Sequence, residues 1–197
     1  MIDPTLKRCL GQAMHAIHVV GAGHGGTERL YTSHWVMQVS FEEPVVLTSV
    51  SPRHDTAALL EASGCFSVSM LAGDQVAQGQ YFSYPGRKFH HIASEYVTTW
   101  ESLPVVVDAI AWLRCEVIER VRGDVADGLD HRIYLARVTA VQGNRLREAP
   151  LLYSSRLGWR VAGDNARKPG ESPRDALLAR LAEAGYDAAP GSGDDDD

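Results

Sequence analysis

The sequence predicts a mainly β protein, with a closed antiparallel β-architecture and helices at its periphery. Segments of alternating apolar and polar residues are frequent, segments with helical periodicity are few, and the links between strands are short. The length of 197 residues, 45% of them hydrophobic, is enough for one domain with a sizeable core and a small appended segment. We expect a β domain at residues 1–163, a linker and helix at 164–187, and a disordered acidic tail at 188–197.

The predicted domain begins with a short helix at residues 4–14 and a strand at residues 16–20. The helix has proline at an early position and two leucines four residues apart. A glycine cluster at residues 21–26 ends the strand, and two further strands follow at residues 35–41 and 45–50. Because only three residues link these two strands, no crossover helix fits between them, and they should pair antiparallel.

The second part of the domain is predicted to contain further helices and strands. The helices are expected at residues 55–62 and 74–82, a turn at 84–86, and the strands at 65–71, 111–121, 132–141, 151–153 and 159–161. Apolar and polar residues alternate in the strand at 65–71, which predicts one face in the core and one face in solvent.

The C-terminal segment is predicted to be a polar linker followed by one amphipathic helix. Residues 165–171 are polar and contain Gly and Pro, Ser172 is a good N-cap, and Pro173 stands at the first helical position. The helix is expected at residues 174–184 with an apolar face of leucines, and Gly185 is placed to end it.

The composition argues against several classes of protein. The formal net charge is −6, and the terminal run of four aspartates carries most of it, so without a basic stripe we expect no nucleic-acid binding. We find no leader and no apolar run of about 20 residues, which predicts a cytoplasmic protein without membrane contact. Cys9, Cys65 and Cys115 are widely spaced, which indicates reduced thiols rather than a disulfide framework or a metal site.

Two local motifs resemble binding sites, one for a dinucleotide and one for a metal, but each lacks the further residues that such a site needs. The run GAGHGG at residues 21–26 fits the GxGxxG pattern of a dinucleotide-binding turn and follows a strand. That site also needs a helix opening on the last glycine, but residues 27–34 lack helical periodicity, so we interpret the run as a flexible loop between barrel strands. His15 and His18 lie three residues apart, but no third ligand follows at metal-site spacing, and no metal is expected.

The segment TSHWVMQVSFEEPVVL, at residues 32–47, resembles the signature of the flavin reductase-like, FMN-binding split-barrel family. The resemblance continues in order along the chain at residues 51–71, 82–83, 86–89, 103–105, 111–115, 130–131 and 150–153. It implies an antiparallel split β-barrel of the FMN-binding type. Because such barrels pair through their open face, it also implies a homodimer with the flavin at the interface.

The resemblance further implies a set of cofactor-binding residues. They are Thr32, Ser33, His34, Trp35, Ser49, Val50, Ser51, Arg53, Thr56, Phe82, Arg87 and Lys88. The residues of the signature and of the edge at 49–51 would lie against the ring and ribityl chain of FMN or FAD. Arg53 and the start of the following helix would hold the phosphate, because N–H groups and the helix dipole favour an anion there. Arg87 and Lys88 would add charge-assisted contacts.

His131 is the residue to which the resemblance gives a catalytic role. In flavin reductases that resemble this chain, a histidine at the Asp-His position lies beside the nicotinamide and helps to place it over the flavin. Because hydride passes between the two cofactors, the protein mainly orients them. The resemblance thus implies an NAD(P)H:flavin oxidoreductase that uses FMN or FAD and passes reduced flavin to a partner oxygenase.

Two positions depart from the family pattern. His34 stands where the family usually has a small residue, so its ring is expected to crowd or stack on the flavin. Asp55 puts a negative charge beside the expected phosphate, which is unfavourable unless it caps its own helix. His131 favours the reductase over a non-enzymatic electron carrier with bound flavin. His34 and Asp55 leave open a degenerate barrel that binds another cofactor, such as haem or a pyridoxal-type group.

Overall fold

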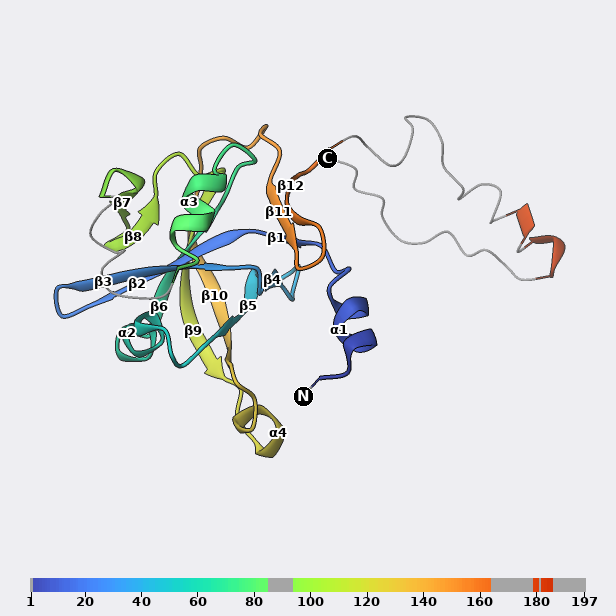
Figure 1. Cartoon of the computed structure of the whole chain (residues 1–197), viewed down its shortest axis with the longest axis horizontal. Helices are drawn as coiled ribbons and strands as arrows, with labels where there is room; N and C mark the ends of the chain where they lie inside the picture. Colours follow the sequence, from blue (N-terminus) through green and yellow to red (C-terminus); the bar gives the residue numbers. More distant parts are fainter. Residues whose placement is uncertain (1, 85–93, 164–178, 181, 186–197) are drawn as a thin grey trace. The chain divides into compact units, whose positions relative to one another are not determined.

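A curled antiparallel sheet of seven strands forms the centre of the structure, a computed structural model that describes residues 2–84, 94–163, 179–180 and 182–185 (Figure 1). The strand order is β3–β2–β6–β9–β10–β5–β4, and every neighbouring pair runs antiparallel. These strands are β2 (His18–His24), β3 (Thr27–Ser33), β4 (Val36–Gln38), β5 (Val45–Val50), β6 (Cys65–Met70), β9 (Ala111–Arg120) and β10 (Arg132–Gly143). The predicted mainly β, antiparallel split-barrel fold is confirmed.

Two small sheets and several short helices complete the described structure. One sheet contains β1 (His15–Ala16), β11 (Leu151–Ser154) and β12 (Gly158–Val161), and the other contains β7 (Val97–Trp100) and β8 (Leu103–Val106). The helices are α1 (Pro4–Leu10), α2 (Asp55–Ser63), α3 (Val76–Tyr81), the 3₁₀ helix η2 (Ser94–Tyr96) and α4 (Asp124–Asp127). Among the described residues, no helix is long and apolar enough to cross a membrane.

The helices expected at residues 55–62 and 74–82 are confirmed as α2 and α3. Helix α2 ends before Gly64, whose φ of 69° is a left-handed conformation that glycine adopts at little cost. Helix α1 is shorter than predicted and ends at Leu10, because Gly11 follows as its C-cap.

The strand predictions succeed where a strand belongs to the large sheet. Strands β4 and β5 pair antiparallel, with Val36 opposite Thr48, as the three-residue link predicts. Strand β4 is shorter than the predicted strand at 35–41. The two long strands are confirmed as β9 and β10, and the two closing strands as β11 and β12. Strand β3 and the β7–β8 hairpin are absent from the predicted elements.

The glycine cluster at residues 21–26 is not a flexible loop, so that interpretation is wrong. Strand β2 runs through its first glycines, and the last two, at φ of 58° and 75°, form the turn into β3. Gly21 is required within the strand, because a Cβ there would lie 2.6 Å from Ser67 Oγ and would also collide with the Pro104 carbonyl oxygen. The hairpin confirms that no dinucleotide-binding helix begins at this cluster.

Strand β6 is buried on both faces, so the prediction of a half-buried strand is also wrong. Ser67 and Ser69, the polar residues of the alternation, are fully buried. The Ser67 hydroxyl donates a hydrogen bond to the Pro104 carbonyl oxygen, and Ser69 Oγ accepts one from the Val106 N–H at 2.9 Å. These contacts with β8 supply the hydrogen bonds that buried hydroxyls need, in place of water.

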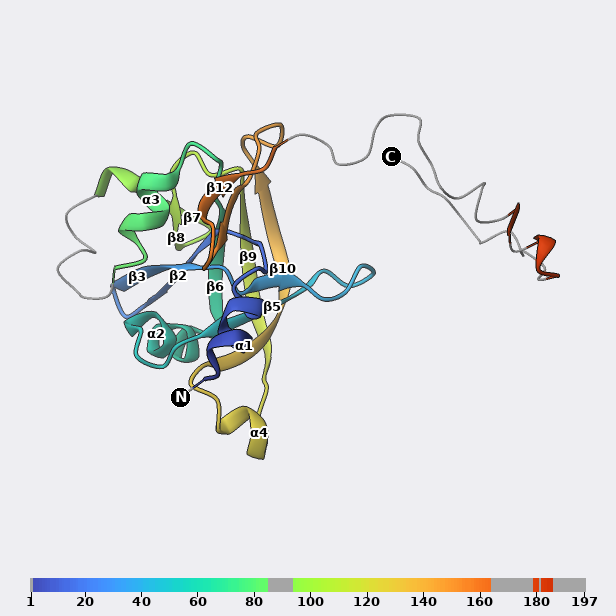
Figure 2. The ribbon, with the colours of Figure 1, turned by 45° about the vertical axis from the view of Figure 1, so that its right-hand side comes forward.

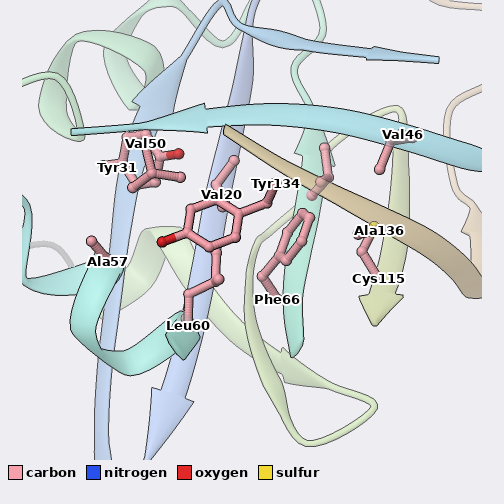
Figure 3. Packing of buried hydrophobic residues seen from close by; sticks show 12 residues of the cluster. Val20, Tyr31, Val46, Val50, Ala57, Leu60, Phe66, Cys115, Tyr134 and Ala136 are labelled. Carbon is pink, nitrogen blue, oxygen red and sulfur yellow. The ribbon is translucent and has the colours of Figure 1, made fainter. Parts of the chain in front are cut away.

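The main hydrophobic core packs α2 against the large sheet (Figure 3). Ala57 and Leu60 of α2 are buried together with Val20, Phe66 and Tyr134 from three strands of the sheet. Val50, the last residue of β5, belongs to the same core. Because both ends of the link from β5 to α2 are anchored here, the link is held in place.

The residues from 163 onward form a separate compact unit, which is described only in part. Residues 179–180 and 182–183 are helical. The N–H of Gly185 donates to the Ala182 carbonyl oxygen at 3.0 Å, and the φ of Gly185 is 79°. The predicted linker, the first turns of the predicted helix and the acidic tail lie outside the described residues.

Candidate flavin and nicotinamide site

A cavity of about 510 Å³ lies against β4 and β5. Its lining comes from β1 and the residue before it, the link between β3 and β4, strands β4 and β5, and the start of β10 with the loop that precedes it. The lining residues are Met14, His15, Ala16, His34, Trp35, Val36, Met37, Leu47, Ser49, Leu129, Asp130, His131 and Ile133. The fold therefore brings together the predicted site residues His34, Trp35, Ser49 and His131, and the volume is typical of a small-molecule site.

Four aromatic side chains of the lining pack on one another and on Tyr153, and we call these five rings the ring wall: His15, His34, Trp35, His131 and Tyr153. The rings of Trp35 and His131 meet edge to face, with centroids 4.5 Å apart and planes at 89°. His34 lies 4.6 Å from Trp35 and also contacts the rings of His15, at 5.3 Å, and Tyr153, at 5.9 Å. Such ring pairs favour tilted and edge-on geometries, so the ring wall is held by packing.

His131 is oriented by its neighbour Asp130. The distance from His131 Nδ1 to Asp130 Oδ1 is 2.9 Å. The hydrogen bond from His131, and then its charge, lower the pKa of Asp130. Because an ionised carboxylate only accepts hydrogen bonds, Nδ1 carries the proton in this contact and Nε2 is left for a ligand.

Burial is the main cause that lowers the pKa of two other histidines near the cavity. The pKa of His34 is lowered by burial and then by the charges of His15 and His131. The pKa of His54 is lowered by burial and by His131, against an opposing effect of Asp55. Both rings are therefore mostly neutral near pH 7.

The alternation of β5 decides which of its residues reach the cavity. Leu47 and Ser49 line it, whereas Val50 is fully buried in the core on the opposite face. The Ser49 N–H donates to the Trp35 carbonyl oxygen at 3.1 Å, which ties β5 to the ring wall. The side chain of Val50, a predicted cofactor residue, faces the core, so a cofactor contact from Val50 would have to use its backbone.

The β5–α2 turn, residues 51–54, is built by local contacts. Ser51 Oγ accepts a hydrogen bond from the Arg53 N–H at 3.3 Å, and the Ser51 carbonyl oxygen accepts one from the His54 N–H at 3.0 Å. His54 is the N-cap residue of α2 and makes no capping hydrogen bond with its side chain, because its ring stacks on Tyr31 at 4.9 Å. Arg53 is exposed at this turn. The positive end of α2 is thus presented beside the exposed guanidinium group of Arg53, an arrangement that suits a phosphate.

Asp55 lies in the first turn of α2, and His54 occupies the N-cap position before it. Its carboxylate lies 3.7 Å from Arg29 Nε of β3. This ion pair offsets part of the negative charge that stands beside the turn. Thr56, predicted to contact the phosphate, is 2% exposed, so its side chain belongs to the protein interior.

The family model for the flavin reductase-like domain matches residues 10–157, most of the chain. The chain belongs to the flavin reductase-like family. Among curated relatives, the reductase component of 4-hydroxyphenylacetate 3-monooxygenase from Thermus thermophilus is 33% identical over 156 residues, which cover 79% of this chain and 94% of the relative. The NADH-dependent flavin reductase StyB from Pseudomonas fluorescens is 33% identical over 122 residues, which cover 61% and 63%.

Solved structures of flavin reductases share the fold. The NADH:FAD oxidoreductase SgcE6 of Streptomyces globisporus, solved with NAD and FAD fragments, superposes with a TM-score of 0.72 at 23% identity and covers 85% of this chain and 99% of its own. The flavin reductase of styrene monooxygenase from Pseudomonas putida S12 gives a TM-score of 0.69 at 24% identity, with coverage of 81% and 99%. The resemblance stated from the sequence motifs is confirmed.

Three predicted cofactor residues of this flavin reductase-like chain make contacts inside the protein instead of lining the cavity. Thr32 donates its hydroxyl to the Gly79 carbonyl oxygen at 2.6 Å, which ties β3 to α3. Ser33 is buried, and its Oγ accepts the Trp35 N–H at 3.1 Å. Phe82 is buried in the second core cluster. Arg87 and Lys88 lie outside the described residues.

Sequence reasoning missed His15 and Tyr153 of the ring wall, and His54 of the β5–α2 turn. From the sequence, His15 was considered only as half of a metal-ligand spacing, and no metal was expected there. The pairing of β1 with β11 sets His15 opposite Tyr153, far away in sequence. The family pattern was the one available signal, since its closing segment at 150–153 includes Tyr153.

Proposed function

We propose that this protein is an NAD(P)H-dependent flavin reductase whose cavity holds the flavin ring beside the nicotinamide. The observation that carries the proposal is the position of His131. It lines a cavity on a chain of the flavin reductase-like family, and both Asp130 and Trp35 fix its ring. A bound flavin would supply the hydride acceptor, and the protein's part would be to orient two ligands.

The residues present fit a flavin phosphate as well as its ring. The cavity offers flat aromatic and aliphatic surface together with the Ser49 hydroxyl. The β5–α2 turn offers Arg53 and the start of α2, where the side chain of the N-cap residue His54 makes no capping hydrogen bond. We propose FMN as the flavin, with FAD as a second ligand of the same site, because the phosphate contacts expected at the turn are common to both.

His131 would bind and orient the nicotinamide. Its Nδ1 is engaged with Asp130 Oδ1 at 2.9 Å, which leaves Nε2 for a hydrogen bond with the carboxamide of the nicotinamide. A hydrogen bond of this kind would hold the nicotinamide ring in place, and it needs no proton transfer from His131. The role is therefore one of positioning for hydride transfer.

We propose a homodimer as the working form. Met37, Val39, Phe41 and Val141 are between 47% and 96% exposed, which is unusual for large apolar side chains that lie in one region. Met37 and Val141 line the same apolar hollow, and Figure 2 shows that the β4–β5 hairpin extends away from the rest of the sheet. A second copy that covers this surface would remove it from water.

We further propose that the reduced flavin serves a partner oxygenase in the cytoplasm. Two curated relatives are reductase components of monooxygenases, which supports a partner of this class. Cys9, Cys65 and Cys115 are free thiols, and Cys9 is exposed, which suits a reducing compartment.

The visible spectrum of the purified protein, with added FMN and NAD(P)H, tests the function. The proposal predicts that NAD(P)H bleaches the flavin absorbance at a rate that depends on protein concentration. A flavin that stays bound and indifferent to NAD(P)H would instead support an electron carrier. A protein that does not bind FMN or FAD would contradict both functions.

A further inference from the structure

His34 is the most connected residue of the ring wall. Its ring contacts Trp35 within the same link, His15 from β1 and Tyr153 from β11. His34 and Trp35 lie at the bend between β3 and β4, outside both strands. Neighbouring side chains of a strand point to opposite faces, whereas this bend lets both rings line one cavity and pack on each other.

The backbone and the indole of Trp35 are held in different ways. The Trp35 N–H donates to Ser33 Oγ and its carbonyl oxygen accepts the Ser49 N–H, each at 3.1 Å. Trp35 is 42% exposed, and its indole contacts the rings of both His34, at 4.6 Å, and His131, at 4.5 Å. Without the His34 ring, one of these two supports would be lost and the indole could turn about its side-chain bonds.

We propose that His34 is a positioning residue, whose ring holds the Trp35 indole in its perpendicular contact with His131 and thereby fixes the orientation in which His131 meets the nicotinamide. The proposal rests on the proposed flavin reductase function. His34 acts through its packing against Trp35, so that a ring of similar size without nitrogen would serve as well. This gives a specific role to the side chain that departs from the small residue usual at this position.

The charges around His34 agree with a packing role. The titratable groups that face it are His15 from β1, Tyr153 from β11, and His131 with its partner Asp130 from the loop before β10. Burial and the two neighbouring histidines lower its pKa, so the ring is mostly neutral near pH 7. A neutral ring can rest against the indole without the desolvation cost of a buried charge.

The test compares His34→Ala, His34→Leu and His34→Phe in two measurements. In ligand-free protein, the iodide quenching of Trp35 is isolated by subtracting the same variant carrying Trp35→Phe. We expect His34→Ala to increase the quenching of Trp35, and His34→Phe to leave it near the wild-type level. His34→Leu keeps bulk without a ring and should fall between them, and it also serves if the alanine variant does not fold.

The second measurement is steady-state turnover with NAD(P)H and FMN. His34→Ala should raise KM for NAD(P)H by roughly 2- to 12-fold, the loss of one aromatic pair, with a smaller change in kcat. His34→Phe should stay near wild type. If His34→Phe is as impaired as His34→Ala in turnover, the imidazole itself contacts a ligand and the proposal is wrong.

Equal quenching of Trp35 in all variants would also overturn the proposal, because His34 would then not hold the indole. This arm uses ligand-free protein and so decides the proposal even if the wild type does not reduce flavin. A wild-type protein that does not reduce flavin would contradict the flavin reductase function alone, and not the packing role of His34.

Discussion

The ring wall draws its five side chains from four segments between residues 15 and 153, whereas the β5–α2 turn is built within a few consecutive residues. The ring wall is held by packing between rings, and the turn by hydrogen bonds between near neighbours and by the start of a helix. The two regions would therefore divide the work of the site. The turn would bind the end of a ligand that every flavin nucleotide shares, and the ring wall would orient the ring that reacts.

The largest effect is expected at the ring wall, with His131→Ala. Loss of the residue that orients the nicotinamide should slow flavin reduction by roughly 10- to 100-fold, because small errors in placement are costly for hydride transfer. The affinity for FMN should change little. Stopped-flow reduction and a fluorescence titration with FMN measure the two quantities, and His24→Ala, at an exposed histidine of the β2–β3 hairpin, is the control. An equal loss of rate and affinity would make His131 a structural residue.

A smaller effect is expected at the β5–α2 turn with Arg53→Ala, and it should fall on FMN affinity. Removal of the exposed guanidinium should weaken FMN binding by roughly 3- to 10-fold, a charge-assisted contact reduced by exposure to solvent. Riboflavin, which has no phosphate, should bind the variant and the wild type alike. Arg137→Ala removes an exposed arginine that pairs with Glu43 at 3.3 Å on another part of the sheet, and it should change neither ligand. If Arg53→Ala weakens riboflavin as much as FMN, the turn does not hold the phosphate.

The contrast between the two regions also explains what the sequence could predict. The turn follows from local signals: a strand that ends at Val50, a helix that begins at Asp55 and a glycine that ends that helix. The ring wall depends on strand pairings across the chain, such as His15 opposite Tyr153, which no local pattern encodes. Family resemblance supplied His131, Trp35 and Ser49, and it could not show that Val50, Thr56 and Phe82 are buried.

The errors in the fold prediction have a related cause. The alternation of β6 resembles that of a strand with one solvated face, but the hairpin at residues 97–106 covers that face. Within this hairpin, the Pro104 carbonyl oxygen accepts a hydrogen bond from Ser67, and the Val106 N–H donates one to Ser69. The glycines of residues 21–26 resemble a loop, but position 21 needs glycine because Ser67 of β6 and Pro104 of β8 leave no room for a Cβ. In both places the deciding partner is distant in sequence, so periodicity alone selects the wrong environment.

The smallest effect is expected from Asp55→Asn, which sharpens the role of the turn. The carboxylate stands beside the expected phosphate and is offset in part by Arg29 at 3.7 Å. Its removal should strengthen FMN binding by about 2- to 5-fold at low salt, since one like charge is removed near the ligand and Arg29 is released to attract it.

The gain in FMN affinity from Asp55→Asn should shrink as ionic strength rises, because salt screens the repulsion between an exposed carboxylate and the phosphate. FMN titrations at two salt concentrations measure this dependence, and Asp124→Asn, in the first turn of α4, is the matched control. Helix α2 should lose a little stability, because an acidic residue in the first turn favours the helix dipole, and a thermal melt checks that loss. If Asp55→Asn and the wild type bind FMN with the same affinity at low salt, the phosphate lies away from the start of α2. The β5–α2 turn would then have to be assigned a structural role.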